Sequence, residues 1–294
     1  MQTAVQLSSI QKSKNSITRR RIQKLFANRL AIFGLFIALL VTLMCICAPL
    51  LTKWDPTLID MSKRYAPPSS EHIFGCDQSG RDIWARLLYG GRVSIMLGIV
   101  CSLCANTLGA MIGCVAGYFG GRTDRLIMFI SEVFGAFPNM MLILIIRGFS
   151  KGGVWVLLCI WIFTGWGGTM RLVRSRILSL KHEVFVESCQ ATGVSSRSIM
   201  FSHLLPNSMG VYIINISSSV AGYVLGEAGL SFLGLGVPKG IPTWGNMLNA
   251  ARSLSTMQNH PMLWILPGIA ISIFVLGVNF FGDGLRDVFD VAEE

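Results

Sequence analysis

Residues 183–207 read EVFVESCQATGVSSRSIMFSHLLPN, and they decide how the rest of the chain is interpreted. This is the longest polar segment that lies between two strongly apolar ones, residues 153–170 and 210–229. From Val184 the residues follow a helical pattern up to Gly193, and glycine ends a helix well because it accepts a positive φ. The first part of the segment therefore predicts a short helix that is closed by a tight turn.

A second short helix is predicted directly after that turn, with Ser195 or Ser196 as its N-cap. Pro206 is expected to break the chain before the next apolar run. One face of this second helix is apolar and carries Ile199, Met200 and Leu204. Two short helices at a fixed angle form a compact knob just outside a membrane, which suits a groove on a soluble partner. The alternative is a solvated loop that only joins two spans.

The composition indicates an integral membrane protein. The chain has 294 residues, of which 52% are hydrophobic and only 14% charged, whereas soluble domains are about a quarter charged. The mean hydropathy is +0.58. The net charge of +10 does not predict nucleic-acid binding, because the basic residues flank apolar runs, where positive charge sets orientation in the membrane.

Six membrane spans are predicted, each near the length of about 20 residues that a helix needs to cross a bilayer. They are residues 30–51, 93–118, 125–146, 153–170, 210–229 and 262–281. A basic cytoplasmic arm, residues 1–29, precedes an uncleaved first span, and residues 30–294 form one transmembrane domain. An even number of spans places both termini inside, and the lysines and arginines are more frequent on that side.

The connections between the spans carry turn chemistry. An external loop is predicted at 53–91, and its end, residues 82–89, is expected to be an amphipathic helix on the membrane surface. An inner turn is predicted at 119–124 and an external turn at 147–152. A Gly-rich external segment is predicted at 229–240, followed by a surface loop at 241–261 with a short helix near 244–253. Gly282 and Gly284 are expected to end the last span.

Several residues inside the spans stand out. Gly109, Gly113 and Gly117 recur at every fourth position, which lets another helix approach closely. Glu132 is a carboxylate at membrane depth, where such groups usually face the bundle interior or a water-filled path. Pro138 is expected to kink the third span, and Glu227 lies near the outer end of the fifth.

The segment 183–207 resembles the "EAA" loop of ABC importer permeases, in which a Glu and two small residues are followed by a Gly six positions after the Glu, an apolar residue and Leu-Pro. Ser188 and Cys189 stand here where the family usually has alanines. The resemblance implies a coupling helix that seats in the ATPase subunit. The residues that would make this contact are Glu187, Ser188, Cys189, Ala191, Gly193, Ile199, Leu205 and Pro206.

Further pieces of the chain look like the second of the two permeases in the dipeptide, oligopeptide and nickel family. These pieces are HIFGCDQSGRDIWARLLYGGRVSIML (72–97), EAGLSFLGLGV (227–237), WGNML (244–248) and GDGLRD (282–287). The resemblance implies a type I ABC importer permease fold in a bacterial inner membrane. It also implies a homologous partner permease, two ATP-binding cassette ATPase subunits and an extracytoplasmic solute-binding protein, with lipid around the spans and no nucleic acid.

No catalytic residue, cofactor site or metal site is expected. Because no glycine is followed by lysine, the chain has no GxxxxGK[ST] phosphate loop, so ATP hydrolysis must occur in separate subunits. The histidines lack metal-site spacing, and Cys101 and Cys104, although spaced as CxxC, lie inside a span and are expected to be buried packing residues.

Two alternatives to an ABC permease remain open. An autonomous secondary transporter or channel would use titration of Glu132 and Glu227, with helices broken at Pro138 and Pro267. A membrane scaffold would leave the segment 183–207 unexplained. Within the resembled family, di- and oligopeptides are the first expectation for cargo, and nickel or a metal chelate is the second.

Overall fold

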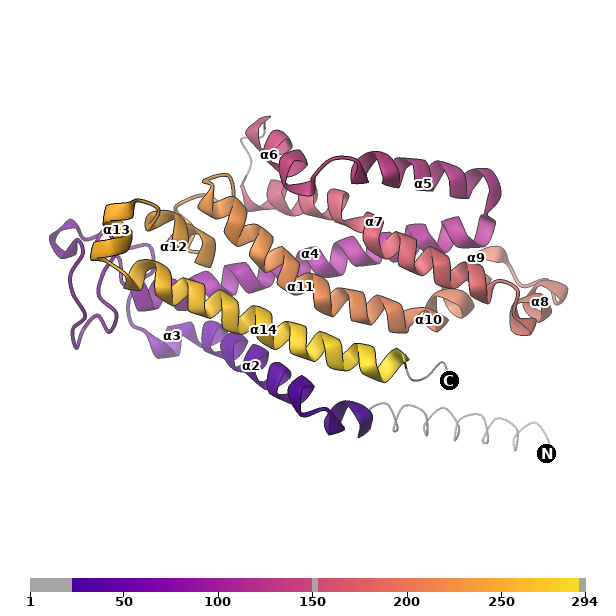
Figure 1. Ribbon diagram of the computed structural model, residues 1–294, viewed down its shortest axis with the longest axis horizontal. Coiled ribbons are helices and arrows are strands. Elements are labelled where there is room, and N and C mark those ends of the chain that lie inside the picture. Colours follow the sequence, from indigo (N-terminus) through magenta and orange to yellow (C-terminus); the bar gives the residue numbers. More distant parts are fainter. Residues whose placement is uncertain (1–22, 150–152, 291–294) are drawn as a thin grey trace.

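The computed structural model describes residues 23–149 and 153–290, and within these ranges every secondary-structure element is a helix. Long helices lie side by side in an elongated bundle (Figure 1). The helices that are long and apolar enough to cross a membrane are α2 (Arg29–Ile46), α4 (Ile83–Phe119), α7 (Val154–Leu180), α11 (Met209–Phe232) and α14 (Met262–Asp290). The prediction of an all-α membrane protein is confirmed.

The predicted third span, residues 125–146, is a broken pair of helices. Helix α5 (Gly121–Gly135) and helix α6 (Asn139–Phe149) meet at an angle of 80°. Pro138 lies at the break. It interrupts the helix because proline has no N–H to donate and disfavours a helical conformation in the residue before it. Residues 23–149 and 153–290 therefore contain five continuous helices that could each cross a membrane, or six candidate spans if this bent pair counts as one.

Helix α4 begins earlier than predicted. Residues 82–89 do not form a separate surface helix, because Asp82 caps α4 and its Oδ1 accepts a hydrogen bond from the Ala85 N–H at 2.6 Å. Ile83 and Leu88, two apolar residues of this segment, are buried against the rest of the chain. The 37 residues of α4 therefore run from the loop at residues 52–82 through the whole bundle.

Two other spans also extend beyond their predicted ends. Helix α7 continues to Leu180, and α14 continues to Asp290 instead of ending at Gly282 and Gly284. These glycines serve helix contact: a Cβ on Gly284 would lie 2.2 Å from the Ala31 Cβ of α2. At the N-terminal side, the predicted first span is divided into α2 and the short α3 (Ala48–Leu51).

The glycines of α4 allow close approach of another helix, and the structure shows that this helix is α7. A Cβ on Gly109 would lie 2.4 Å from the Trp166 carbonyl oxygen, and a Cβ on Gly113 would lie 2.4 Å from that of Met170. A Cβ on Gly117 would lie 2.8 Å from the Ile177 Cβ. Because the obstacles at Gly109 and Gly113 are backbone atoms, the two helices cannot approach this closely with larger side chains.

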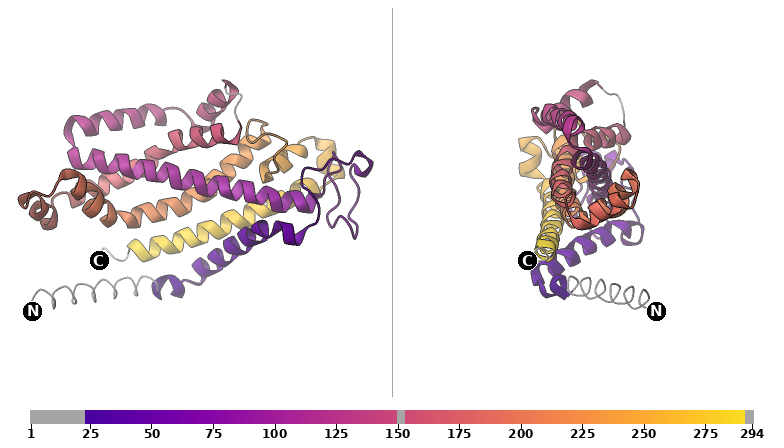
Figure 2. Two further views of the ribbon diagram at one scale, coloured as in Figure 1. Left: turned by 180° about the vertical axis from the view of Figure 1, so that it is seen from behind. Right: turned by 90° about the vertical axis from the view of Figure 1, so that its right-hand side faces the viewer.

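The bundle has two different ends, which both views of its length show (Figures 1 and 2). The loop end carries residues 52–82 and two short helices, α12 (Trp244–Ala250) and α13 (Leu254–Asn259). The opposite end, called the knob end, carries α8 (Val184–Ala191), α9 (Ser196–Ser198), the π-helical turn η2 (Ile199–Leu204) and α10 (Leu205–Asn207).

Several predicted features lie at these two ends or outside the described residues. The short helix expected near 244–253 is present as α12, and the inner turn is formed by Gly120 and Gly121, both with positive φ. Most of the predicted N-terminal arm (residues 1–22) and part of the predicted external turn (residues 150–152) lie outside the described residues.

Replacing Gly113 by leucine is expected to destabilise the protein, because the new side chain would have to displace the Met170 backbone. Overpacking of this kind costs about 1–3 kcal/mol or more. The matched control is Gly268→Ala in α14, where a Cβ would meet nothing within 4 Å. Thermal unfolding of the purified protein in detergent measures both changes, and equal melting temperatures for the two variants would contradict the packing described here.

Candidate functional site

The knob, defined as residues 183–207, is built by local sequence signals. Helix α8 ends with Gly193 at φ +76°, and the Val194 N–H donates to the Cys189 carbonyl at 3.0 Å, which is a glycine-dependent helix stop. Ser195 then caps α9 by accepting a hydrogen bond from the Ser198 N–H. The predicted helix–turn–helix is therefore present, with Ser195 as its N-cap.

One face of the knob is locked onto the ends of α4 and α7. Val186, Ile199, Met200 and Leu204 are buried in one cluster with apolar residues of those two helices. The α4 and α7 members of this cluster are Ala110, Cys114, Tyr118, Val173 and Ile177. The Tyr118 hydroxyl also donates to Ser196 Oγ at 3.2 Å. One face of the knob is therefore packed into the apolar core at this end of the bundle.

The other face of the knob is exposed. Glu187 and Ala191 point outward on α8, next to Val184, whose side chain is 75% exposed. Val184 and Phe185, two exposed apolar side chains beside the Glu187 carboxylate, form a surface that suits a protein contact.

The residues predicted to contact an ATPase are thus divided between the two faces. Glu187, Ser188, Ala191, Gly193 and Pro206 are exposed, Cys189 and Leu205 are partly buried, and Ile199 is buried in the core. Pro206 does not break the chain as predicted: it lies in the first turn of α10, where a proline N–H is not needed, and the interruption falls at Ser208.

A polar network lies within the membrane-spanning part of the bundle, where α4, α7 and α11 meet. Asn106 Nδ2 donates to Ser219 Oγ at 2.7 Å, and Asn106 Oδ1 accepts hydrogen bonds from Thr169 Oγ1 and Asn215 Nδ2. Ser102 joins this network through Asn106 and Ser219. Uncharged amides and hydroxyls at this depth are costly unless they are paired or serve a path.

This network borders a cavity of about 380 Å³. Asn106, Thr169, Asn215 and Ser219 line one side of it, and Asn139 with Met140, directly after the α5–α6 break, line another. Glycines and aromatic rings complete the wall: Gly165, Gly168, Gly222, Gly226, Trp161 and Tyr223. The break at Pro138 therefore brings the start of α6 to a polar hollow, where amide and hydroxyl groups can bind a polar solute.

The two carboxylates singled out in the sequence lie in opposite environments. Glu132 is exposed on α5 and does not face the interior of this bundle. Glu227 has no exposed surface: its Oε2 accepts from Ser94 Oγ at 2.9 Å and its Oε1 from Ser231 Oγ at 2.6 Å. Ser94 Oγ in turn accepts from the Trp244 N–H at 3.2 Å, so this chain of hydrogen bonds joins α4, α11 and α12.

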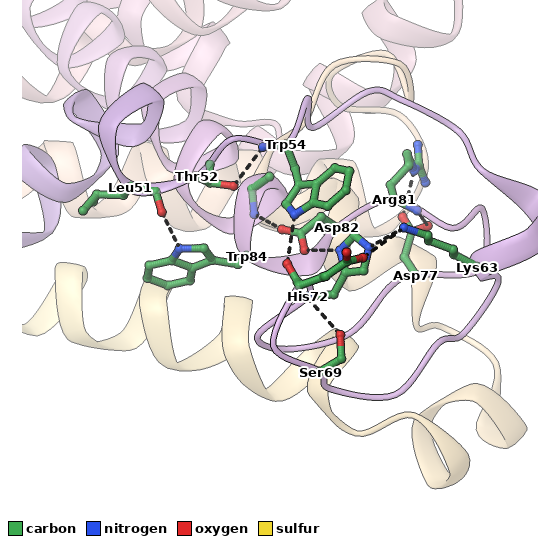
Figure 3. A network of polar contacts seen from close by, with 12 residues as sticks. Leu51, Thr52, Trp54, Lys63, Ser69, His72, Asp77, Arg81, Asp82 and Trp84 are labelled. Carbon is green, nitrogen blue, oxygen red and sulfur yellow. Dashed lines mark hydrogen bonds and ion pairs between the residues drawn. The ribbon is translucent and has the colours of Figure 1, made fainter.

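The loop end contains a second polar network (Figure 3). His72 Nδ1 lies 2.8 Å from Asp82 Oδ2, and His72 Nε2 lies 3.2 Å from Lys63 Nζ. Because an ammonium group only donates, Nε2 accepts and Nδ1–H donates to Asp82. Asp77 accepts from Arg81 Nε at 2.8 Å and pairs with buried Arg86. These contacts hold the loop in one conformation.

Other groups of the loop end are also structural. Burial raises the pKa of the Cys76 thiol to about 11, so it stays protonated and unreactive at neutral pH. A hydrogen bond from the Ser62 hydroxyl lowers the pKa of Asp60. Gly80 has φ +73°, and a Cβ there would lie 1.7 Å from the Asp60 carbonyl oxygen. Asp77, Arg81 and Asp82 are therefore structural residues of this loop.

Comparison with known proteins decides the family. Residues 109–292 match the family described as "binding-protein-dependent transport system inner membrane component". Residues 16–68 match the N-terminal transmembrane domain of oligopeptide transport permease C. This chain belongs to the family of binding-protein-dependent transport permeases.

Full-length relatives agree with this assignment. The permease is 38% identical to the dipeptide transport system permease protein DppC of Alkalihalophilus pseudofirmus, over 92% of this chain and 89% of the relative. It is 33% identical to the oligopeptide transport system permease protein OppC of Bacillus subtilis, over 96% and 92% of the two chains. It is 32% identical to OppC of Haemophilus influenzae, over 98% and 93%.

The polar network of the permease was missed by sequence reasoning, which looked for charged residues and metal ligands inside spans. Asn106, Thr169 and Asn215 come from three helices that are far apart along the chain, so no local pattern joins them. The available signal was an asparagine within an apolar run, as at Asn106.

Replacing Glu227 by leucine is expected to lower the stability of the permease, because the Ser94 and Ser231 hydroxyls would lose their buried acceptor. Each unsatisfied buried group costs about 1–3 kcal/mol. Thermal unfolding in detergent measures this loss, with Glu132→Leu on exposed α5 as the matched control. A Glu227→Leu protein as stable as this control would show that the hydrogen-bond chain does not stabilise the fold.

Proposed function

We propose that this chain is a permease subunit of an ATP-driven importer of di- and oligopeptides in the inner membrane of a bacterium. A homologous partner permease would complete the translocation path, two ATPase subunits would hydrolyse ATP, and a solute-binding protein would deliver the peptide. The names of the relatives, which are dipeptide and oligopeptide permeases, support this cargo over nickel.

The observation that carries the proposal is the division of the knob into two faces. Its inner face is buried with α4 and α7, and its outer face presents Glu187, Ser188 and Ala191 beside exposed Val184. A force applied by an ATPase subunit to the outer face would therefore move α4 and α7 with the knob. Because the ATPase subunits would lie in the cytoplasm, the knob end and both termini would be cytoplasmic, and the loop end would face outward.

The polar hollow is the part of the chain that suits a translocation path. It lies between the strongly packed α4–α7 pair and the start of α6, whose helix is separated from α5 by the 80° break. A movement of the pair relative to α6 would change the width of this hollow. Alternating access needs two arrangements of this kind, which ATP binding and hydrolysis would select.

The competing interpretation, an autonomous carrier driven by titration of Glu132 and Glu227, has less support. Glu227 is enclosed by hydroxyl donors and has no exposed surface, so it does not border a path in this conformation. Family membership also favours a subunit of a binding-protein-dependent system. Pro138 stays a candidate for the path because it lies at the α5–α6 break, and Glu132, in the last turn of α5, stays a candidate because a partner permease could cover its exposed face.

Replacing Glu187 by lysine is expected to abolish uptake, because it reverses the charge at the centre of the outer face while leaving the buried face intact. A deletion strain complemented with the variant would be tested for uptake of a labelled dipeptide and of nickel, and the amount of permease in the membrane would be measured alongside. The wild type should restore dipeptide uptake.

The matched control for this variant is Asp283→Lys, the same charge reversal at an exposed position of α14 near the knob end. It is expected to support normal uptake. Normal dipeptide uptake by the Glu187→Lys strain would contradict the coupling role of the knob. Restoration of nickel uptake alone by the wild type would contradict a peptide cargo.

A further inference from the structure

A second cavity, of about 230 Å³, continues the polar hollow along α7. Both cavities are lined by Asn139, Thr164, Gly165 and Gly168. The second one lies between α5 and α7, which run beside each other in both views of the bundle's length (Figures 1 and 2), and ends at Ser131 and Arg171. The hollow with the Asn106 network thus extends toward a single guanidinium group.

Arg171 is a cation without a carboxylate partner in the described part of the chain. Its Nη1 donates to the Ser131 hydroxyl at 2.8 Å, which is a neutral group, and Ser131 itself is buried. Among the described residues that line the two cavities, none is acidic. Arg174, nearly one turn further along α7, differs because Asp124 accepts hydrogen bonds from both its Nε and its Nη2.

Two glycines of α7 lie beside this guanidinium, and Gly167 allows Ser131 to approach α7 closely. A Cβ on Gly167 would lie 2.9 Å from Ser131 Oγ and 3.6 Å from Arg171 Nη1. A Cβ on the neighbouring Gly168 would meet nothing within 4 Å, so this side of α7 is open to the cavity. An unpaired charge on a spanning helix is costly unless it faces water or a ligand, and Arg171 is exposed to this cavity.

We propose that Arg171 binds the free carboxylate of the substrate at the knob-end side of the polar hollow. A guanidinium presents two parallel N–H donors that match a carboxylate, and this pairing is stronger than a neutral hydrogen bond. The amide and hydroxyl groups around Asn106 then contact the peptide groups of the same substrate. This inference rests on the proposed function, because it assigns a chemical class to the solute that passes through the hollow.

A purely structural role for Arg171 is the competing explanation, since its bond to Ser131 connects α7 with α5. Three substitutions separate the two roles. Arg171→Gln removes the charge but keeps an N–H donor, Arg171→Lys keeps the charge, and Ser131→Ala removes the connection but leaves the guanidinium. Arg125→Gln, at an exposed arginine of α5, is the matched control.

The experiment compares uptake of two peptides by proteoliposomes that contain the assembled transporter, each peptide supplied at a concentration that saturates the solute-binding protein. One peptide has a free C-terminal carboxylate and the other is its C-terminal amide. Arg171→Gln is expected to slow uptake of the free peptide by about tenfold or more, the scale of a charge-assisted hydrogen bond, and to leave the amide unchanged. The wild type is expected to import the free peptide faster than the amide. Ser131→Ala and Arg125→Gln are expected to keep this preference, and Arg171→Lys, which keeps the charge but not the two parallel donors, is expected to keep a weaker one.

A chemical rescue tests the charge without an amidated peptide. Arg171→Cys is made in a protein whose exposed Cys104 and Cys159 are replaced by serine. Modification with aminoethyl methanethiosulfonate adds a positive charge and is expected to restore part of the uptake of the free peptide, whereas methyl methanethiosulfonate is not expected to restore any. Restoration by both reagents or by neither would overturn the proposal.

Equal slowing of both peptides by Arg171→Gln and by Ser131→Ala would also overturn it, since Arg171 would then only connect two helices. This outcome differs from failure of the proposed function, in which the wild-type transporter imports neither peptide.

Discussion

The close contact between α4 and α7 is the interaction on which the rest of the structure depends. Gly109 and Gly113 bring the two backbones to a separation that no side chain would allow, and Gly117 continues the contact toward the knob. Without a hydrophobic effect between helices in lipid, close packing of this kind is a main source of helix association. The α4–α7 pair therefore forms a stiff unit along most of the bundle.

Both functional regions of the permease are attached to this pair. At one end the pair provides the apolar cluster that holds the inner face of the knob, with Tyr118 from α4 and Ile177 from α7. Nearer the middle, Asn106 of α4 and Thr169 of α7 form the polar network beside the hollow. Under the proposed function, a displacement of the knob would thereby be transmitted to the wall of the hollow. Helices α5 and α6 are attached to the pair by fewer contacts, among them Arg174 with Asp124.

Local signals in the sequence predicted the knob and the glycine contact well. These signals act through the nearby backbone, so a short stretch of sequence is enough to recognise them. They are Gly193, Ser195 and the spacing of Gly109, Gly113 and Gly117. Helix ends were predicted less well. Gly284 was taken for a helix stop, but it contacts α2, a helix more than 200 residues earlier in the chain, and no local pattern contains that information. Tertiary contact likewise turned the amphipathic residues 82–89 into the start of α4.

The account is tested most directly by asking whether the knob and the α4–α7 pair move as one body. Spin labels at Gln190 on the exposed face of α8 and at Cys104 on the exposed face of α4 would be measured by pulsed electron paramagnetic resonance in the assembled transporter, without nucleotide and with ATP bound. The account predicts the same distance in both states. A distance that changes on ATP binding would show that the knob moves independently of α4 and would contradict it.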